Sequence, residues 1–519
     1  MIHYITDAIL HDQKACDELV EASDPPSALV FLFKYLYTLC KTRGYKAILK
    51  FWSHEAIDLE PTLALLQACG GHHHLWEVRY TLLLWLSLLV IIPFDLKVLD
   101  EQAESSTATL MRRISDIATR FLDATGKERD AAAIVLARLL TRKDTHAGLD
   151  AFLAYTDETL RKESGLTVFQ ATGIVSTLAA IFKTGNRDLL LPRAAKILPL
   201  CERAFTTKPS CTNTVVRKNA IKAVQRIGLT FLKPQVTKWR YQRGHRSLAT
   251  NLQATNQTTS LHVAAASALP QPSSVKQNKR MESEEEENEE EEEEPPEEIE
   301  EVLQLLLEGL RDKDTIVRWS AAKGLGRVTA RLSADFAGEV IESIIDLFAE
   351  NVILISETEE VTRAMAIKEA NLSATSDATW QGVCLALAEV ARRGLLLPER
   401  IESLLPWLLR ALTYDVQRGA HSVGAHVRDA ACYVCWSFAR AYAPAVMAPF
   451  VHTLASQLIL ITLFDREINV RRAASAAIQE NVGRQGIFPR GIDLITAADY
   501  FTIGNRQNAF TNVALTVAR

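Results

Sequence analysis

Residues 297–332 carry two runs of apolar residues at helical spacing, separated by a short polar turn. The first run predicts a helix built on Val302, Leu303, Leu306, Leu307 and Leu310. After polar residues 311–314, a second helix is expected to begin at Thr315, with Val317, Ala321, Leu325 and Val328 on its apolar face. Its small residues Ala322, Gly324 and Gly326 allow a neighbouring helix to come close. Neither helix buries its apolar stripe alone, so the pattern predicts a hairpin that stacks on others.

The start of the second helix, a turn followed by a Val-Arg pair, returns along the chain. The pairs are Val216-Arg217, Val317-Arg318, Val427-Arg428 and Val470-Arg471. Arg428 and Arg471 are 43 residues apart, and HEAT and armadillo repeats typically run about 40 to 47 residues. Arg318 and Arg428 are 110 residues apart, which fits two periods if polar residues 350–378 are an insertion and residues 380–394 form the intervening helix.

Other helical segments fill the chain, and no series of strands and turns interrupts them. The clearest are residues 27–42, 75–92, 130–140, 165–183, 189–204 and 214–232. We therefore expect an all-α protein, a HEAT/armadillo-type α-solenoid of stacked helical hairpins. Asp312, Asp314, Arg318, Asp465 and Arg471 are expected to cap turns and to form ladders between repeats.

Charge is strongly polarised in the middle of the sequence. Residues 203–281 contain no Asp or Glu, whereas residues 282–301 contain 15 Glu and no Lys or Arg. Removing these 15 acidic residues from the formal net charge of −5 leaves +10 for the rest of the chain. We divide the chain into an amino-terminal solenoid, residues 1–248, a disordered polar and Glu-rich loop, residues 249–296, and a continuing solenoid, residues 297–519.

The Glu run has two interpretations. We favour a solvated linker inside a solenoid loop, because such a composition cannot bury enough apolar surface to fold. The alternative is an anionic arm that contacts a basic partner or screens the basic stretch beside it.

A basic and aromatic stretch precedes this loop. It contains the predicted partner-binding residues Lys238, Trp239, Arg240, Tyr241, Arg243 and Arg246. A protein partner with an acidic face is the preferred reading. Nucleic acid is less favoured because no recognised nucleic-acid module is present. Cations stacked on aromatic rings at a repeat edge would give the same residues.

Signals for catalysis or metal binding are poor. His72, His73 and His74 are consecutive and point in different directions, which suits a polar loop better than a metal site. Cys432-x-x-Cys435 lacks a second ligand pair, and Gly324-x-Gly326 lies within a predicted helix with no strand before it. We expect no catalytic, cofactor or metal site, and a binding protein that is not an enzyme.

Nothing in the sequence suggests export or a membrane span. The longest apolar run, residues 81–92, stops at Pro93, short of the roughly 20 residues that a span needs. Residues 1–17 lack a secretory pattern, and eight scattered cysteines suit reduced thiols in the cytoplasm.

Long stretches of the sequence resemble the tubulin-folding cofactor D family, and they follow the order found in the amino-terminal half of its members. They are residues 82–95, 228–234, 239–244, 312–327, 392–400, 427–442, 471–486 and 491–501. The Glu run and residues 350–378 are longer than the usual loops of that family. The chain also ends inside an apolar helix after Gln507, whereas family members continue for about as long again.

The resemblance implies a cytoplasmic chaperone associated with the microtubule cytoskeleton. It would bind β-tubulin, meet tubulin-folding cofactors C and E, and bind an Arf-like small GTPase. Such an assembly would build and take apart the tubulin heterodimer and contribute to GTPase activation. The alternative is a generic HEAT-repeat scaffold or transport receptor for another client, for which the fold alone would serve equally well.

Overall fold

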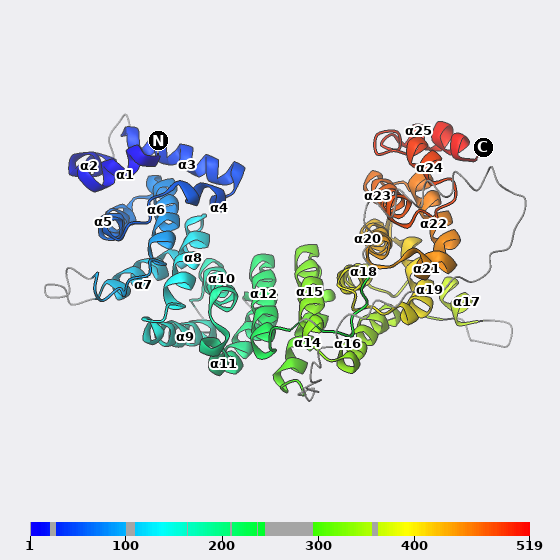
Figure 1. The fold of residues 1–519 in the computed structure, drawn as a ribbon, viewed down its shortest axis with the longest axis horizontal. Helices are drawn as coiled ribbons and strands as arrows, with labels where there is room; N and C mark the ends of the chain where they lie inside the picture. Colours follow the sequence, from blue (N-terminus) through cyan, green and yellow to red (C-terminus); the bar gives the residue numbers. More distant parts are fainter. Residues whose placement is uncertain are drawn as a thin grey trace, which may run out of the picture.

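The structure is a computed structural model that describes residues 2–20, 27–99, 109–162, 165–207, 210–235, 237–243, 294–354 and 362–518. These residues are almost entirely helical and form a two-layered solenoid bent into a U, with the two ends of the chain on opposite arms (Figure 1). The expected all-α repeat architecture is confirmed.

One layer of helices lines the hollow of the U, and each member packs on the next. These inner helices are α6 (Trp76–Leu89), α8 (Glu128–Leu140), α10 (Val168–Thr184), α12 (Thr214–Phe231), α15 (Thr315–Val328), α18 (Asp377–Arg392), α20 (Ala425–Ala441) and α23 (Ile468–Gln485). One inner helix, α18, lies between α15 and α20, as the two-period spacing predicts.

A second layer covers the outside. Its helices are α5 (Leu59–Ala68), α7 (Leu110–Arg120), α9 (His146–Arg161), α11 (Arg187–Thr206), α14 (Glu298–Leu310), α16 (Ala334–Asp346), α19 (Ile401–Leu412) and α22 (Val451–Phe464). One continuous apolar core runs between the layers. Repeat by repeat, this core buries the stripes that isolated hairpins would expose.

Shorter elements close the ends and fill the turns. The amino-terminal arm ends in α1 (Ile2–His11), α2 (Gln13–Val20), α3 (Ala28–Arg43) and α4 (Tyr45–Ile48), and the other arm in α24 (Gly491–Ala497), α25 (Arg506–Asn508) and α26 (Ala514–Ala518). Between repeats lie α17 (Arg363–Lys368), α21 (Pro444–Met447) and an antiparallel hairpin of β1 (Val416–Arg418) and β2 (His421–Val423).

The arginine of each predicted Val-Arg pair is the fourth residue of an inner helix, and its guanidinium is almost fully buried. Each donates backward to a carbonyl near its own turn and forward to the next repeat. The forward acceptors are Asp312 for Arg217 at 2.7 Å, Gln381 for Arg318 at 2.8 Å, Asp465 for Arg428 at 2.6 Å, and the Ile503 carbonyl for Arg471 at 2.9 Å. The predicted ladder is confirmed, and it ties consecutive repeats together.

The sequence analysis missed one rung of this ladder. Arg79 is the fourth residue of α6, donates backward to the Cys69 carbonyl at 3.1 Å, and forms a buried ion pair with Glu128 of α8 at 2.7 Å. Val78 precedes it, so the same dipeptide was present in the sequence. Removing one partner of such a buried pair leaves an uncompensated charge and typically costs about 3 to 5 kcal/mol.

The predicted close approach of helices at small residues is confirmed at Gly324. A methyl group built on Gly324 would lie 2.7 Å from a side-chain methyl of Leu306 on α14. A larger residue would push α14 and α15 apart.

Residues 350–378, interpreted from sequence as a polar insertion, contain ordered structure that packs on the repeats. Ile353 and Asn371 form an isolated β-bridge, α17 contacts α19, and Ala366 and Ile367 of α17 are buried. Polar residues around α17 hide this short apolar face in the sequence.

The two solenoid parts expected from sequence meet directly, because α12 packs against both α14 and α15. The predicted loop, residues 249–296, lies outside the described residues up to residue 293.

One described stretch, Pro444–Phe464, is long and apolar enough to cross a membrane by length and composition. It is 44% buried, and its main helix, α22, packs between α19 and α23. The stretch therefore serves as an outer repeat helix, and the test alone is weak evidence for a span.

Candidate protein-binding surfaces

The predicted basic and aromatic stretch lies on an extended segment, residues 237–243, which we call the strap. The strap follows α12 and runs past the carboxy-terminal ends of α15, α18, α20 and α23 (Figure 1). Its hydrogen bonds, in chain order, are Trp239 Nε1 to the Leu332 carbonyl at 3.1 Å, Tyr241 N to the Gly394 carbonyl at 2.8 Å, and Arg243 to the Ala439 and Arg484 carbonyls at 2.8 and 2.7 Å.

Arg243 explains why a cation sits at this edge of the solenoid. The last carbonyls of a helix have no partner within the helix, and the helix dipole places partial negative charge there. The Arg243 guanidinium donates to the end of α20 and to the end of α23 at once. It therefore joins two repeats through acceptors that every helix offers.

Gly394 allows the strap to reach α18. Its φ of +75° lies in the left-handed region that disfavours side chains, and an added Cβ would lie 2.1 Å from the Tyr241 carbonyl oxygen. Any side chain here would push the strap away from the solenoid.

The aromatic ring of Tyr241 anchors the strap on α20. Its centroid lies 5.4 Å from that of buried Tyr442, and its hydroxyl accepts a hydrogen bond from the Ala443 amide at 3.1 Å. Burial raises the pKa of Tyr442, so its hydroxyl stays neutral and donates to the Leu396 carbonyl at 2.6 Å.

The strap residues divide into two groups. Trp239, Tyr241 and Arg243 are half-buried and contact the solenoid itself, as expected for cations and rings at a repeat edge. Lys238 is exposed, Arg240 is half-buried, and Arg246 lies outside the described residues. Their contact with a partner stays a prediction.

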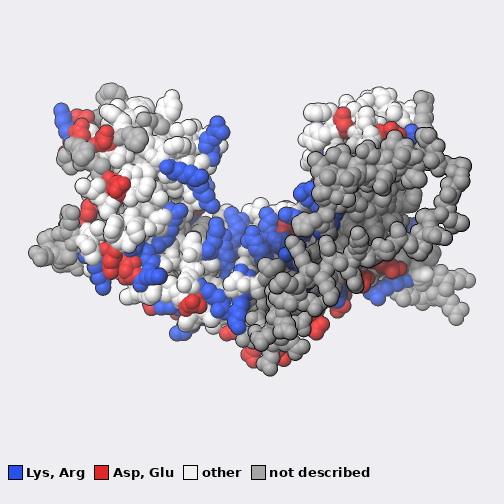
Figure 2. Space-filling view, in the orientation of Figure 1, with Lys and Arg blue, Asp and Glu red and all other residues white. Residues whose placement is uncertain are grey.

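A second basic surface, which the sequence analysis missed, lines the hollow. Figure 2 shows Lys and Arg side chains gathered over its floor, where few acidic side chains are visible. We call it the basic floor and define it by two stripes at i, i+4 spacing: Lys218, Lys222 and Arg226 on α12, and Lys323 and Arg327 on α15. This spacing places successive side chains on one face of a helix.

The charges of the basic floor are crowded and poorly neutralised. Burial, together with Lys218, Arg226, Lys323 and Lys183, lowers the pKa of Lys222 to about 8. Burial and Arg327 lower the pKa of Arg226 to about 10, while its guanidinium donates to the Ala179 carbonyl. In the described part of the chain, no ion pair joins Lys218, Lys222, Lys323 or Arg327 to a carboxylate. The floor therefore carries net positive charge.

An aromatic ladder continues from the floor toward α20. Trp319 lies on α15 with its ring centroid 5.6 Å from Tyr433, and Tyr433 stacks on Trp436, also at 5.6 Å. Lys323 lies 4.8 Å from the Trp319 ring, and Arg440 lies 4.6 Å from the Trp436 ring. Trp, Tyr and Arg are the residues that most often dominate binding energy at protein interfaces.

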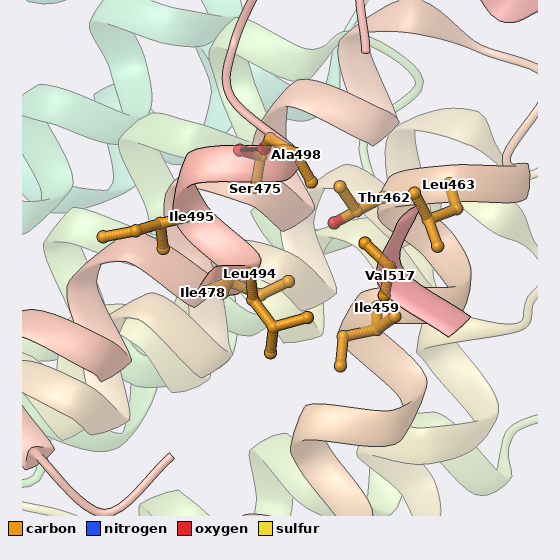
Figure 3. A pocket seen from close by; sticks show the side chains of 9 residues that line it. All are labelled: Ile459, Thr462, Leu463, Ser475, Ile478, Leu494, Ile495, Ala498 and Val517. Carbon is orange, nitrogen blue, oxygen red and sulfur yellow. Dashed lines mark hydrogen bonds between the residues drawn. The ribbon is translucent and has the colours of Figure 1, made fainter. Parts of the chain in front are cut away.

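The described residues offer little for catalysis. Among them, no group of three or more His, Cys, Asp or Glu could hold a metal ion, and Cys432 and Cys435 are buried in α20, where burial raises the pKa of each thiol. A cavity of about 10 Å³ lies between α22, α23, α24 and α26. Its lining is mostly apolar, and the Ser475 hydroxyl already donates to the Ala498 carbonyl (Figure 3). That volume holds about one water molecule.

Comparison with known families places this architecture. The family described as tubulin-specific chaperone D-like, ARM repeats, matches residues 215–492, which include α12, the strap and every helix from α14 to α23. The chain belongs to the tubulin-specific chaperone D-like family. A second description, tubulin-specific chaperone D-like, ARM repeat, matches residues 2–160.

Curated relatives agree with the chaperone D assignment. Tubulin-specific chaperone D of Dictyostelium discoideum is 33% identical over 94% of this chain, which spans 37% of that protein. Tubulin-folding cofactor D of Schizosaccharomyces pombe is 29% identical over 93% of this chain and 39% of that protein. This chain thus spans less than two fifths of either relative.

Solved structures give a looser likeness. The crystal structure of Kap121p matches 99% of this chain and 46% of its own, with 11% identity and a TM-score of 0.44. The crystal structure of Kap121p bound to Nup53p gives a TM-score of 0.36 at 11% identity, over 99% of this chain and 54% of that chain.

Proposed function

We propose that this chain is a tubulin-folding scaffold that captures β-tubulin in the hollow of its solenoid. Family membership over residues 215–492 carries the proposal. The basic floor and the aromatic ladder supply charge and rings on the same inner surface. A solenoid that flexes between repeats suits a globular client.

Further partners follow from the family resemblance. Tubulin-folding cofactors C and E and an Arf-like small GTPase would meet tubulin on this scaffold in the cytoplasm, near the microtubule cytoskeleton. The assembly would contribute to GTPase activation by holding the partners in place. The chain itself would act without a catalytic site of its own.

Affinity capture tests this function directly. The chain is immobilised, incubated with a cytosolic extract across a salt series, and the bound β-tubulin and Arf-like GTPase are quantified. Recovery of both supports the proposal. Recovery of the GTPase alone would assign tubulin capture to parts of the relatives that this chain does not span.

A matched variant makes the capture informative about surface. Arg217→Ala removes a buried ladder ion pair and should reduce capture only through loss of folding, which a thermal melt detects. A folded chain that retains neither partner, while a full-length relative retains both, would contradict the proposal. An unrelated client in the bound fraction would instead favour a generic scaffold or transport receptor.

A further inference from the structure

The two stripes of the basic floor have a spacing that matches an extended peptide. Lys218 and Lys222 on α12, like Lys323 and Arg327 on α15, are four residues apart, which places their Cβ atoms about 5 to 6 Å from each other. Side chains on one face of an extended chain repeat every ~6.6 Å. Each stripe therefore offers cations at nearly the period of the acidic side chains of such a peptide.

We propose that the basic floor is a docking surface for a Glu-rich polypeptide segment bound in an extended conformation. The proposal deepens the function proposed above and rests on it for the location of the client, because it gives the hollow a class of ligand. Carboxylates laid along α12 and α15 would neutralise Lys218, Lys222, Lys323 and Arg327. Their stems are long enough to follow a segment of variable sequence.

The roles of neighbouring arginines support a binding function for these cations. Arg217 lies on α12 beside the floor and is buried with Asp312 at 2.7 Å, so its charge is used inside the fold. Lys218 and Lys222 on the same helix are half-exposed and lack such a carboxylate in the described residues. Burial and like charges lower the pKa of Lys222, so the floor costs folding stability, as surfaces kept for binding often do.

Protein fits this surface better than single-stranded nucleic acid. Binding of bases needs free aromatic faces, whereas the ladder rings stack on one another, with Lys323 and Arg440 lying over the Trp319 and Trp436 rings. The whole chain has a pI of about 6.2, unlike the basic domains that bind nucleic acids.

The test measures binding of a fluorescent poly-glutamate peptide to the whole chain by anisotropy, with a poly-glutamine peptide as the uncharged control. The stripe variant combines Lys222→Gln, Lys323→Gln and Arg327→Gln. A matched variant removes three exposed charges away from the floor, through Lys196→Gln, Lys313→Gln and Lys368→Gln. We expect the stripe variant to lose about tenfold or more in affinity at low salt, and the matched variant to lose less than about threefold.

Folding is checked separately. Because the three floor residues make no ion pair with a described carboxylate, the stripe variant should melt at the same temperature as the original chain or higher. A lower melting temperature together with lost binding would mean that the residues brace the fold, and would overturn the proposal.

Other outcomes are equally decisive. Equal peptide affinity in the stripe and matched variants overturns the proposal, as does tighter binding of a single-stranded RNA than of the peptide. The original chain is also compared with one in which glutamines replace the glutamates of residues 282–294. Binding seen only after that replacement supports the surface and identifies the chain's own acidic run as a competitor, and no binding by either chain overturns it.

The readouts separate this proposal from the tubulin scaffold. Peptide binding through the floor by a chain that captures no β-tubulin would contradict the proposed function and support the surface. Capture of tubulin by a chain that does not bind the peptide would do the reverse.

Discussion

The strap and the basic floor are built from similar residues and use them in opposite ways. In the strap, Arg243 turns inward, and carbonyl oxygens at the ends of α20 and α23 accept its hydrogen bonds. On the floor, Lys222 and Lys323 remain half-exposed without a described carboxylate partner. The difference lies in which end or face of a helix each cation meets.

This contrast teaches that a count of basic residues does not locate a binding surface. The carboxy-terminal end of a helix neutralises a nearby cation through its free carbonyls, whereas the side of a helix offers none. Strap substitutions should therefore lower stability, and floor substitutions should lower binding.

The largest effect is expected at Gly394, where the strap touches α18. Gly394→Ala adds a Cβ that would meet the Tyr241 carbonyl oxygen at 2.1 Å, at a φ of +75°. We expect a loss of about 3 kcal/mol or more in the free energy of unfolding, measured by urea titration. Gly419→Ala is the control, because Gly419 has a φ of +60° and open space around it, so only about 1 kcal/mol should be lost. Equal losses would mean that the strap does not press on α18.

The next effect concerns the cation of the strap. Arg243→Ala removes charge-assisted hydrogen bonds to the ends of α20 and α23 and should lower the free energy of unfolding by about 2 kcal/mol. Lys238→Ala, at an exposed position of the same segment, should change it by less than about 0.5 kcal/mol. A neutral result at Arg243, measured in the same urea titration, would place this guanidinium with the binding residues.

A smaller effect is expected at Tyr241. Tyr241→Phe keeps the ring beside Tyr442 and removes only the hydroxyl that accepts from the Ala443 amide. The free energy of unfolding should fall by about 1 kcal/mol, and amide hydrogen exchange at Ala443 should become faster. Unchanged exchange there would show that water replaces the hydroxyl without cost.

The smallest effect has the opposite sign and belongs to the floor. Burial and like charges lower the pKa of Lys222 to about 8 from its ordinary value of 10.5, so the folded protein binds this proton less tightly than the unfolded chain. Stability from this group is therefore lowest below pH 8 and recovers as the pH rises toward 10.5.

Lys222→Gln should accordingly be slightly more stable than the original chain at pH 7, and the difference should shrink between pH 8 and pH 10. Thermal melts of the two proteins across this range provide the measurement, with Lys196→Gln as the control for an exposed lysine. A difference that stays constant with pH would remove Lys222 from the crowded cluster.

Local pattern was enough for the repeats, because their determinants recur at fixed positions. Val-Arg at residues 216–217, 317–318, 427–428 and 470–471 marks the fourth position of an inner helix, and the ladder follows from that register. Arg79 obeys the same rule but stands outside the spacing that drew attention to the others.

The strap could not be recognised from its own residues. Its acceptors lie far away in sequence, 93 residues from Trp239 to Leu332 and 241 residues from Arg243 to Arg484. The stripes are visible in sequence as Lys218, Lys222 and Arg226 at i, i+4 spacing. Which side of α12 faces the hollow is decided only by the stacking of the other repeats.

The strap also changes how the solenoid should come apart. In repeat proteins each unit contacts only its nearest neighbours, so the ends fray and unfolding proceeds stepwise along the array. The strap connects α15 through α23 in a single run of chain. These four layers should melt as one cooperative block, while the arm built on α6, α8 and α10 remains free to open repeat by repeat.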